Sequence, residues 1–543
     1  MPKLFIFAIG GTGERVLRSL TMVLASGAPT FDNYEVYPII VDYDVDNADK
    51  VKTVELLQNY ADVHNAAFTH HTVAGGLQGQ SGQFFAAKLW NLFDQKNPYI
   101  FPFGPGGENT DIVQNEIFAD HIGYSDLYGS TLATKRLLTS LYDESGNADT
   151  ELNLDMVVGF KGNPNIGSVV FHNIGNTDKF RTFISTYDPT NGDKVVIIGS
   201  LFGGTGASGI PEIVKAIGTQ KPGAKPAAIL VLPYFAPMIK QGGAIQASRF
   251  NSKTKAALSY YDDSQLKNKI DKVYYVGDLQ SSVISYSEGG STQQNNANMV
   301  ELIAAMMIEH YVAGRGASQT EFKFAVNADL ELKKRLFIDD FDATSKNQVL
   351  NHLVELAIGL KFYHDEIHSK KAEAKSYYKY IGLGDAVAGG ADDGNASDLR
   401  KLCTALEGFY SKYQAWLKEL DFEGNGDTIP ANSHRLGLCD MGDEDKDKKR
   451  AYSDIILQGP KMSEDDSKKS AWWSIGSKNK KAFLSDDNLN TYMDSEIKDN
   501  ANGNGHYDTN TNALRAGHEP EWVFADILHR ASVKGFKKLT STD

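Results

Sequence analysis

The sequence predicts an α/β protein: a doubly wound, mostly parallel sheet with a central helix, a second, smaller α+β domain and a C-terminal extension. Apolar runs at 3–9 and 195–199 each end in a glycine-rich loop that leads into a helix-like segment. A third apolar run, at 34–41, ends in the acids of "VDYD". In a doubly wound sheet such loops and acids meet at one edge, at the carboxyl ends of the strands, where ligands bind.

The first part of the chain alternates strand and helix. "KLFIFAIG" (3–10) is typical of a buried strand, "GERVLRSLTMVLASG" (13–27) of an amphipathic helix, and "YEVYPIIVDYD" (34–44) of a second strand. The stretch from about 88 to 193 is less regular and is interpreted as an insertion. It contains a helix-like segment at 130–144 and a pattern at 154–175 that predicts a hairpin.

The alternation resumes at Val195. After the glycine loop, Pro211 and Glu212 are expected to open a helix, and "AAILVLPYF" (227–235) and "KVYYVGD" (272–278) are expected to be strands with a helical segment between them at 249–271. The predicted domains are an α/β domain at 1–318 with its insertion at 88–193 and a central helix at 298–314, a second domain at 319–440, and a charged extension at 441–543. A helix at 519–536 is expected to pack on the body of the protein.

Composition narrows the class of protein. The chain has 543 residues, 41% hydrophobic and 10% aromatic, which is enough for a large core. Its net charge of −14 argues against nucleic-acid binding. The two cysteines offer no disulfide framework and no metal-ligand spacing, and the apolar runs are too short to span a bilayer. With no signal peptide visible, we expect a soluble, cytoplasmic protein without a membrane span.

The glycine-rich loops predict phosphate binding. "FGGTGASG" (202–209) places four glycines in seven positions between a strand and a helix. A plain strand–helix turn needs one or two glycines, whereas exposed backbone N–H groups before a helix form an anion site. "FAIGGTGERV" (7–16) repeats the arrangement, but Val16 stands where a dinucleotide fingerprint has its third glycine.

An acidic loop and a third glycine loop extend the pattern. Asp42, Asp44 and Asp46 follow the second strand. Asp42 could bind a ribose, or the three acids could lie near a phosphate-bound magnesium, with Asp44 as its ligand directly or through water, or they could form a solvated turn. "HHTVAGGLQGQSG" (70–82) holds four more glycines after two histidines that are interpreted as structural or exposed. Three glycine loops and an acidic loop suit a triphosphate better than one dinucleotide pyrophosphate.

The order of these loops resembles the FtsZ/tubulin superfamily, and most of all its divergent bacterial tubulin-like members, over residues 3–330. The family signature G-G-x-T-G-[ST]-G aligns with 203–209 after a shift of one residue. The resemblance implies bound GTP or GDP with Mg²⁺. It implies phosphate contacts from Gly10, Gly11, Thr12, Gly13, Gly203, Gly204, Thr205, Gly206, Ala207 and Ser208, with Gly75, Gly76 and Gly79 facing the terminal phosphate.

The resemblance also implies a ribose loop at 232–237, with Arg249 as its nearest basic residue, and base recognition by Asp278 and Asn298. Asn327 and Asp329 match the loop that, in the family, completes the catalytic site of the next subunit. Leu332 stands where that loop has its second acid, and Glu331, one residue away, could substitute for it. Asp339 and Asp340 are rival positions for that acid. A site completed by a neighbour implies a GTPase that assembles head-to-tail into filaments.

Two other functions stay open. One is a non-hydrolysing, nucleotide-dependent scaffold or sensor that recruits an adaptor or effector protein through the insertion or the C-terminal extension. The other is an NAD(P)-dependent oxidoreductase that uses Gly11, Gly13 and Asp42, but it leaves "FGGTGASG" unexplained and lacks a Tyr-x-x-x-Lys motif or a catalytic histidine pair.

Overall fold

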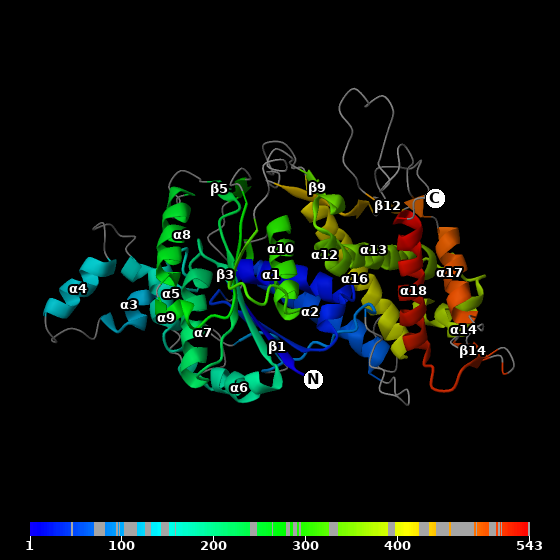
Figure 1. Ribbon diagram of the computed structural model, residues 1–543, viewed down its shortest axis with the longest axis horizontal. Helices are drawn as coiled ribbons and strands as arrows, with labels where there is room; N and C mark the ends of the chain where they lie inside the picture. Colours follow the sequence, from blue (N-terminus) through cyan, green and yellow to red (C-terminus); the bar gives the residue numbers. More distant parts are fainter. Residues whose placement is uncertain are drawn as a thin grey trace, which may run out of the picture.

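A computed structural model gives the fold of the chain (Figure 1). It describes residues 1–44, 47–69, 82–93, 96, 98–101, 117–124, 132–142, 151–157, 159–238, 247–262, 264–278, 283–285, 290–292, 295–324, 335–388, 397–422, 434–440, 455–457, 483–484, 486–498, 506–508, 511 and 513–540.

A six-stranded, all-parallel sheet forms the centre of the molecule. Its order is β2-β1-β3-β4-β6-β8. These strands span Lys3–Ile9 (β1), Glu35–Val41 (β2), Lys194–Ser200 (β3), Ala227–Val231 (β4), Val273–Val276 (β6) and Glu321–Lys323 (β8). The chain leaves β1 toward β2 on one side and returns to β3 on the other, so the topological switch point lies between β1 and β3.

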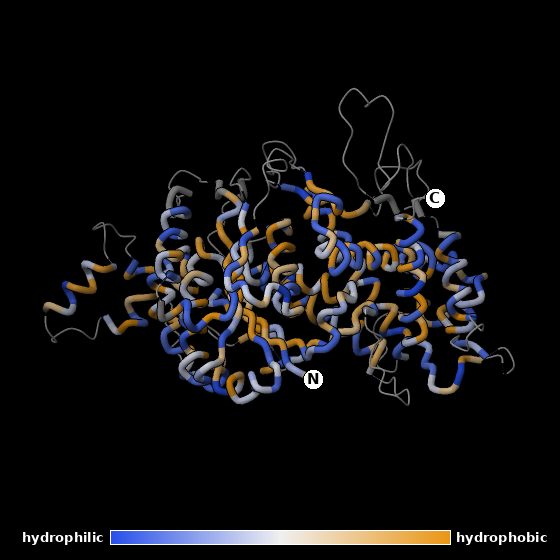
Figure 2. The backbone as a smooth tube through the Cα atoms, in the orientation of Figure 1, coloured by the Kyte–Doolittle hydropathy of each residue, from blue (hydrophilic) through white to orange (hydrophobic). Residues whose placement is uncertain are grey.

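Helices cover both faces of the sheet, as alternation along β1 requires. Leu4, Ile6 and Ala8 join the core beneath α1, α2 and α10, whereas the intervening side chains of β1 join the core beneath α5, α6 and α7. These helices span Gly10–Ala25 (α1), Ala48–Phe68 (α2), Pro164–Phe171 (α5), Asp178–Thr186 (α6), Thr205–Gln220 (α7) and Met299–Val312 (α10). In Figure 2 the hydrophobic colours run along the central strands. The predicted α/β fold with a parallel sheet is confirmed.

The later part of the chain is mainly helical in the described residues and adds three small sheets there, β9–β10, β11–β12–β13 and β14–β15. α13 (Asn351–Phe362), α16 (Asp398–Leu420) and α18 (Pro520–Thr540) share one continuous core with α1 and α2. Figure 1 shows them on the side of the sheet opposite α5, α7 and α8. The prediction that the last helix packs on the body is confirmed, because α18 packs against α13.

Further α-helices and strands lie in the described part of the chain. They are α3 (Phe118–His121), α4 (Leu132–Tyr142), β5 (Ala236–Met238), α8 (Ala247–Tyr261), α9 (Ser264–Lys267), β7 (Val283–Ser285), β9 (Arg335–Phe337), α12 (Ala343–Ser345), α14 (Ser376–Ile381), α15 (Leu383–Ala388), β10 (Arg435–Gly437), β11 (Cys439–Asp440), β12 (Ile455–Leu457), β13 (Phe483–Leu484), α17 (Asp486–Lys498), β14 (Tyr507–Asp508) and β15 (Ala513–Leu514). None of the helices in the described part of the chain is long and apolar enough to cross a membrane.

Two local predictions were wrong. The pattern at 154–175 predicted a hairpin, but the chain forms α5 there, with Pro164 at the start of the helix, where its missing N–H costs nothing. The helix after the signature loop begins at Thr205 rather than at Pro211, which lies inside α7. The domain boundaries stay predictions, although β8 pairs with β6 and so carries the sheet past residue 318.

Candidate functional site

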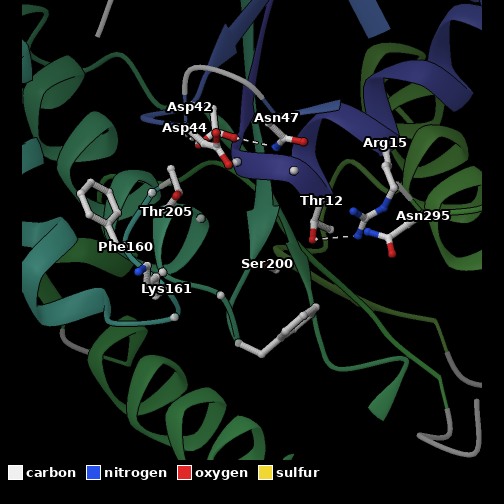
Figure 3. A pocket seen from close by; sticks show the side chains of 18 of the residues that line it. Thr12, Arg15, Asp42, Asp44, Asn47, Phe160, Lys161, Ser200, Thr205 and Asn295 are labelled. Carbon is white, nitrogen blue, oxygen red and sulfur yellow. Dashed lines mark hydrogen bonds between the residues drawn. The ribbon is translucent and has the colours of Figure 1, made fainter. Parts of the chain in front are cut away.

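A pocket opens at the carboxyl ends of β1, β2 and β3, at the switch point of the sheet. It encloses about 800 Å³, including the solvent at its mouth. Four chain segments predicted from the sequence reach it, among them the predicted ribose loop through Phe235, together with two that were not predicted (Figure 3). Its lining residues are Gly10, Gly11, Thr12, Arg15, Asp42, Asp44, Asn47, Gly159, Phe160, Lys161, Gly162, Ser200, Phe202, Gly203, Gly204, Thr205, Gly206, Phe235 and Asn295.

Two helices begin at this pocket. α1 starts at Gly10 and α7 at Thr205, and each is 16 residues long. Neither helix has a side-chain capping hydrogen bond, and neither has an acid in its first turn. Their first-turn N–H groups therefore depend on another acceptor, and both helix dipoles favour a negative charge in the pocket.

Close packing explains why glycine occupies the turn at Gly10. Its φ of +67° is left-handed, and a Cβ there would lie 3.1 Å from Thr205 Cβ. The two loops thus touch each other at the start of their helices. The phosphate site itself stays a prediction.

Three of the predicted phosphate contacts, Gly13, Ala207 and Ser208, do not line the pocket. A Cβ at Gly13 would lie 2.8 Å from the carbonyl carbon of Ala8, so Gly13 lets α1 pack closely on the sheet. Ser208 Oγ donates to the Gly204 carbonyl at 2.8 Å, within the first turns of α7. Ala207 is buried beside it.

The acidic loop contributes two buried carboxylates to the pocket. Asp42 Oδ2 accepts from Asn47 Nδ2 at 3.0 Å, and Asp44 Oδ2 accepts from Gly290 N at 2.7 Å. Lys50 Nζ donates to the Asp44 carbonyl. These partners hold both acids in place, with Asp46 outside the described residues.

Glu14 lies behind this loop and is fully buried. Its Oε2 accepts from Asn47 Nδ2 at 3.1 Å, whereas Oε1 has no hydrogen-bond partner among the described residues. Burial, and then the nearby Asp42 carboxylate, raise the pKa of Glu14 well above its ordinary value, although Lys50 acts in the opposite direction. Glu14 was not predicted as part of the site.

A buried network around Arg15 forms one end of the pocket and was also missed. Arg15 Nε donates to Glu301 Oε1 at 2.7 Å, Nη1 to Asp49 Oδ2 at 3.0 Å, and Nη2 to the Tyr234 hydroxyl at 2.7 Å. Asn295 Nδ2 donates to the same Asp49 oxygen at 3.3 Å. The guanidinium is thereby held by carboxylates from two helices, and it fixes the start of α1 against α10.

The loop at 159–162 forms the opposite end. Gly159, Lys161 and Gly162 all have positive φ, and a Cβ at Gly204 would lie 2.9 Å from Phe160 Cβ. The insertion therefore folds back onto the signature loop and contributes a lysine to the pocket. The glycines of "GFKGNP" were the signal available in the sequence, but the hairpin prediction hid it.

The residues predicted to read the base lie elsewhere. Asp278 Oδ1 is 2.6 Å from His434 Nδ1, and both side chains are buried. Asn298 caps α10 by accepting from Val300 N at 2.9 Å. Neither lines the pocket, which receives Asn295 instead. Arg249 lies in α8, where its side chain is outside the described residues.

The remaining predicted residues fall mostly outside the described part of the chain. This holds for the third glycine loop, with Gly75, Gly76 and Gly79, and for the predicted catalytic Asn327, Asp329 and Glu331. The rival acids are described: Asp339 pairs with Lys346 at 3.0 Å, and Asp340 Oδ2 accepts from Phe337 N at 2.8 Å. Neither of them lines the pocket.

Whether the pocket suits Mg²⁺ depends on the oxygen donors that line it. Within the described ranges, no group of three or more His, Cys, Asp or Glu side chains could hold a metal ion. Mg²⁺ in nucleotide sites takes one or two carboxylates, with phosphate oxygens and waters completing the octahedron. Asp42 and Asp44 beside an anion pocket fit that manner of binding, and do not fit an all-protein cage.

Comparison with known proteins adds little. No protein-family model and no curated protein matches the chain. A matching solved structure is CetZ from Methanosaeta thermophila strain DSM 6194, at 12% identity and a TM-score of 0.22, over 58% of this chain and 53% of that chain. The match thus spans about half of the CetZ chain, and at this TM-score it carries no argument about function.

Proposed function

We propose that this chain is a tubulin/FtsZ-like GTP-binding protein that assembles head-to-tail and hydrolyses GTP between subunits. The observation that carries the proposal is the meeting of two uncapped helix N-termini, through touching glycine loops, at the switch point of a parallel sheet. A single dinucleotide pyrophosphate needs one such terminus. Two of them, with a lysine opposite, suit a longer chain of phosphates.

In this proposal the backbone of Gly11, Thr12, Thr205 and Gly206 binds the phosphates, since all four line the pocket. Bound Mg²⁺ would neutralise phosphate charge, with Asp42 and Asp44 holding its waters. The nucleoside would lie toward Asn295 and Phe235, which also line the pocket. The preference for guanine rests on the family resemblance of the loop order.

Asp329 is the proposed catalytic acid for hydrolysis, and Asn327 and Glu331 are its neighbours in the same loop sequence. An acid from the neighbouring subunit would position the attacking water, and phosphoryl transfer depends mainly on such positioning. An interface that does not close on itself then produces a filament. Turnover should consequently rise with protein concentration.

The test is sedimentation of the purified protein with Mg²⁺ and GTP, ATP or no nucleotide, with phosphate release measured in the same samples. We expect pelleting with GTP and a specific activity that rises with protein concentration. Asp329→Ala should still bind GTP but release phosphate slowly. Binding without pelleting or turnover would favour the scaffold, and tight NAD(H) binding without GTP binding would favour the oxidoreductase.

A further inference from the structure

Among the described residues, two cationic side chains line the pocket, one at each end. Arg15 is bound to Glu301 and Asp49, so its charge is balanced within the protein. Lys161 lies at the other end, beside Phe160 and below Thr205 in Figure 3. A polyphosphate that enters this pocket also meets the carboxylates of Asp42 and Asp44, so its binding requires positive charge near them.

The loop that carries Lys161 is held in place on three sides. Phe160 is buried, with its ring 5.1 Å from that of Tyr43. Asn163 N donates to the Phe160 carbonyl at 2.8 Å, and Lys253 Nζ donates to the Gly162 carbonyl. A Cβ at Gly204 would lie 3.1 Å from Gly162 N. These contacts fix the loop against the signature loop.

Lys161 itself adopts a φ of +45°. A residue with a Cβ pays for the left-handed region, by an amount on the order of 1 kcal/mol, and such conformations persist where the surroundings impose them. The flanking Gly159 and Gly162 have φ values of +78° and +75°, which glycine adopts freely. The surrounding contacts therefore hold the Lys161 backbone in a conformation that lysine seldom adopts alone.

The two ends of the pocket differ in chemistry. Arg15, Asn295 and Tyr234 stand at the end near α10, where Tyr234 also contacts the ring of Phe235. At the Lys161 end, a Cβ on Gly159 would lie 3.8 Å from Asp44 Cβ and 3.9 Å from Thr205 Oγ1. A nucleotide with its aromatic part near Phe235 would run its phosphates past both helix N-termini toward Lys161.

We propose that Lys161 binds the terminal phosphate and makes the pocket prefer a nucleoside triphosphate to a diphosphate. The inference rests on the proposed function, because it needs a nucleotide in the pocket. The ammonium group would form a charge-assisted hydrogen bond that only the triphosphate can accept. Because Lys161 lies in the insertion, the insertion would distinguish the triphosphate from the diphosphate through this loop.

The test measures the affinity of GTPγS and GDP, and of ATPγS and ADP, by calorimetry with Mg²⁺ for the wild type and variants. Lys161→Asn removes the charge while tolerating a left-handed backbone, and Lys161→Gly removes the side chain with no backbone strain. Lys161→Arg keeps the charge. Lys179→Ala is the matched control, because it removes a lysine of α6 that does not line the pocket.

We expect Lys161→Asn and Lys161→Gly to lose about ten- to hundredfold in triphosphate affinity, as for a hydrogen bond to a charged group, with little change for the diphosphate. Lys161→Arg and Lys179→Ala should keep the preference. An unchanged ratio, or an equal loss for both nucleotides, would overturn the role of Lys161 while leaving nucleotide binding intact. A wild type that binds none of the four nucleotides would overturn the proposed function, and this inference with it.

Discussion

Gly204 shows at the residue scale why the signature loop is glycine. A Cβ there would lie 2.9 Å from Phe160 Cβ and 3.1 Å from Gly162 N. Contacts under 3.0 Å cannot be kept, and Phe160 is buried among Tyr43 and Phe171, so it cannot move aside freely. Any side chain at this position must push the lysine-bearing loop away from the helix N-terminus.

We therefore expect Gly204→Ala to weaken nucleotide binding by more than about tenfold, since a displacement near 1 Å at a positioning loop carries that cost. Gly218→Ala, in the same helix, is the control. Its Cβ would meet Lys269 Cδ at 3.2 Å, the end of a flexible side chain, so the affinity should stay unchanged. Calorimetry measures both variants, and a thermal melt checks that each is folded. Equal nucleotide affinity in the two variants would show that the signature loop does not contact the nucleotide.

At the same scale, the sequence revealed the glycines but not which of them line the pocket and which allow close packing. Gly10 and Gly13 stand three positions apart in one motif, yet one faces the pocket and the other faces the Ala8 backbone. Asn298 was predicted from its place before the central helix, and it caps that helix, while Asn295 reaches the pocket. Side-chain direction depends on the backbone angles of each turn, which a composition pattern does not contain.

Elements were predicted best where periodicity is strong. The apolar strands at 3–9 and 194–200 and the helix at 299–312 appear as expected, because local sequence alone specifies a buried strand or an apolar helix. The start of α7 was misplaced because Pro211 is a common opening residue. Here the glycine loop already turns into the helix at Thr205, so Pro211 occupies its second turn.

The packing of α13 on α18 offers a prediction at the scale of elements. A Cβ on Gly359 would lie 2.8 Å from Ser532 Oγ and 3.0 Å from Phe84 Cε2. Gly359→Ala should therefore lower the free energy of unfolding, since overpacking costs about 1–3 kcal/mol against a helix-propensity gain of up to about 1 kcal/mol. Urea unfolding measures the change.

Gly384→Ala in α15 is the matched control for this contact. Its Cβ would meet only Tyr378 Cε1 at 3.7 Å, an ordinary contact. The same change should here be neutral or raise stability by up to about 1 kcal/mol, because alanine restricts the unfolded chain. A stabilising Gly359→Ala would mean that the two helices are not packed as closely as the structure has them.

At the scale of the whole molecule, the site depends on contacts between distant parts of the chain. Arg15 pairs with Glu301, 286 residues away, and Lys253 reaches Gly162, 91 residues away. Neither pair leaves a periodic mark in the sequence, so the Arg15 network could not be predicted, whereas the glycines of "GFKGNP" marked the Lys161 loop without placing it beside the pocket. The edge of the sheet at which ligand-binding loops gather could be predicted, because the topology of the sheet alone determines it.

Glu14 links this site to the stability of the whole fold. Its pKa is raised well above the unfolded value of 4.5 by burial and by Asp42. Above pH 4.5 the unfolded chain therefore releases a proton that the folded chain keeps, so the free energy of unfolding falls as pH rises until the folded pKa is passed. Glu14→Gln keeps an acceptor for Asn47 and removes the charge.

We expect Glu14→Gln to match the wild type in stability near pH 4.5 and to exceed it increasingly toward pH 8, in urea unfolding without nucleotide. Asp178→Asn is the control, because this α6 carboxylate is 68% exposed and pairs with Arg181 at the surface. It should follow the wild-type profile at every pH. A constant difference between Glu14→Gln and the wild type from pH 4.5 to 8 would show that Glu14 is ionised in the folded protein.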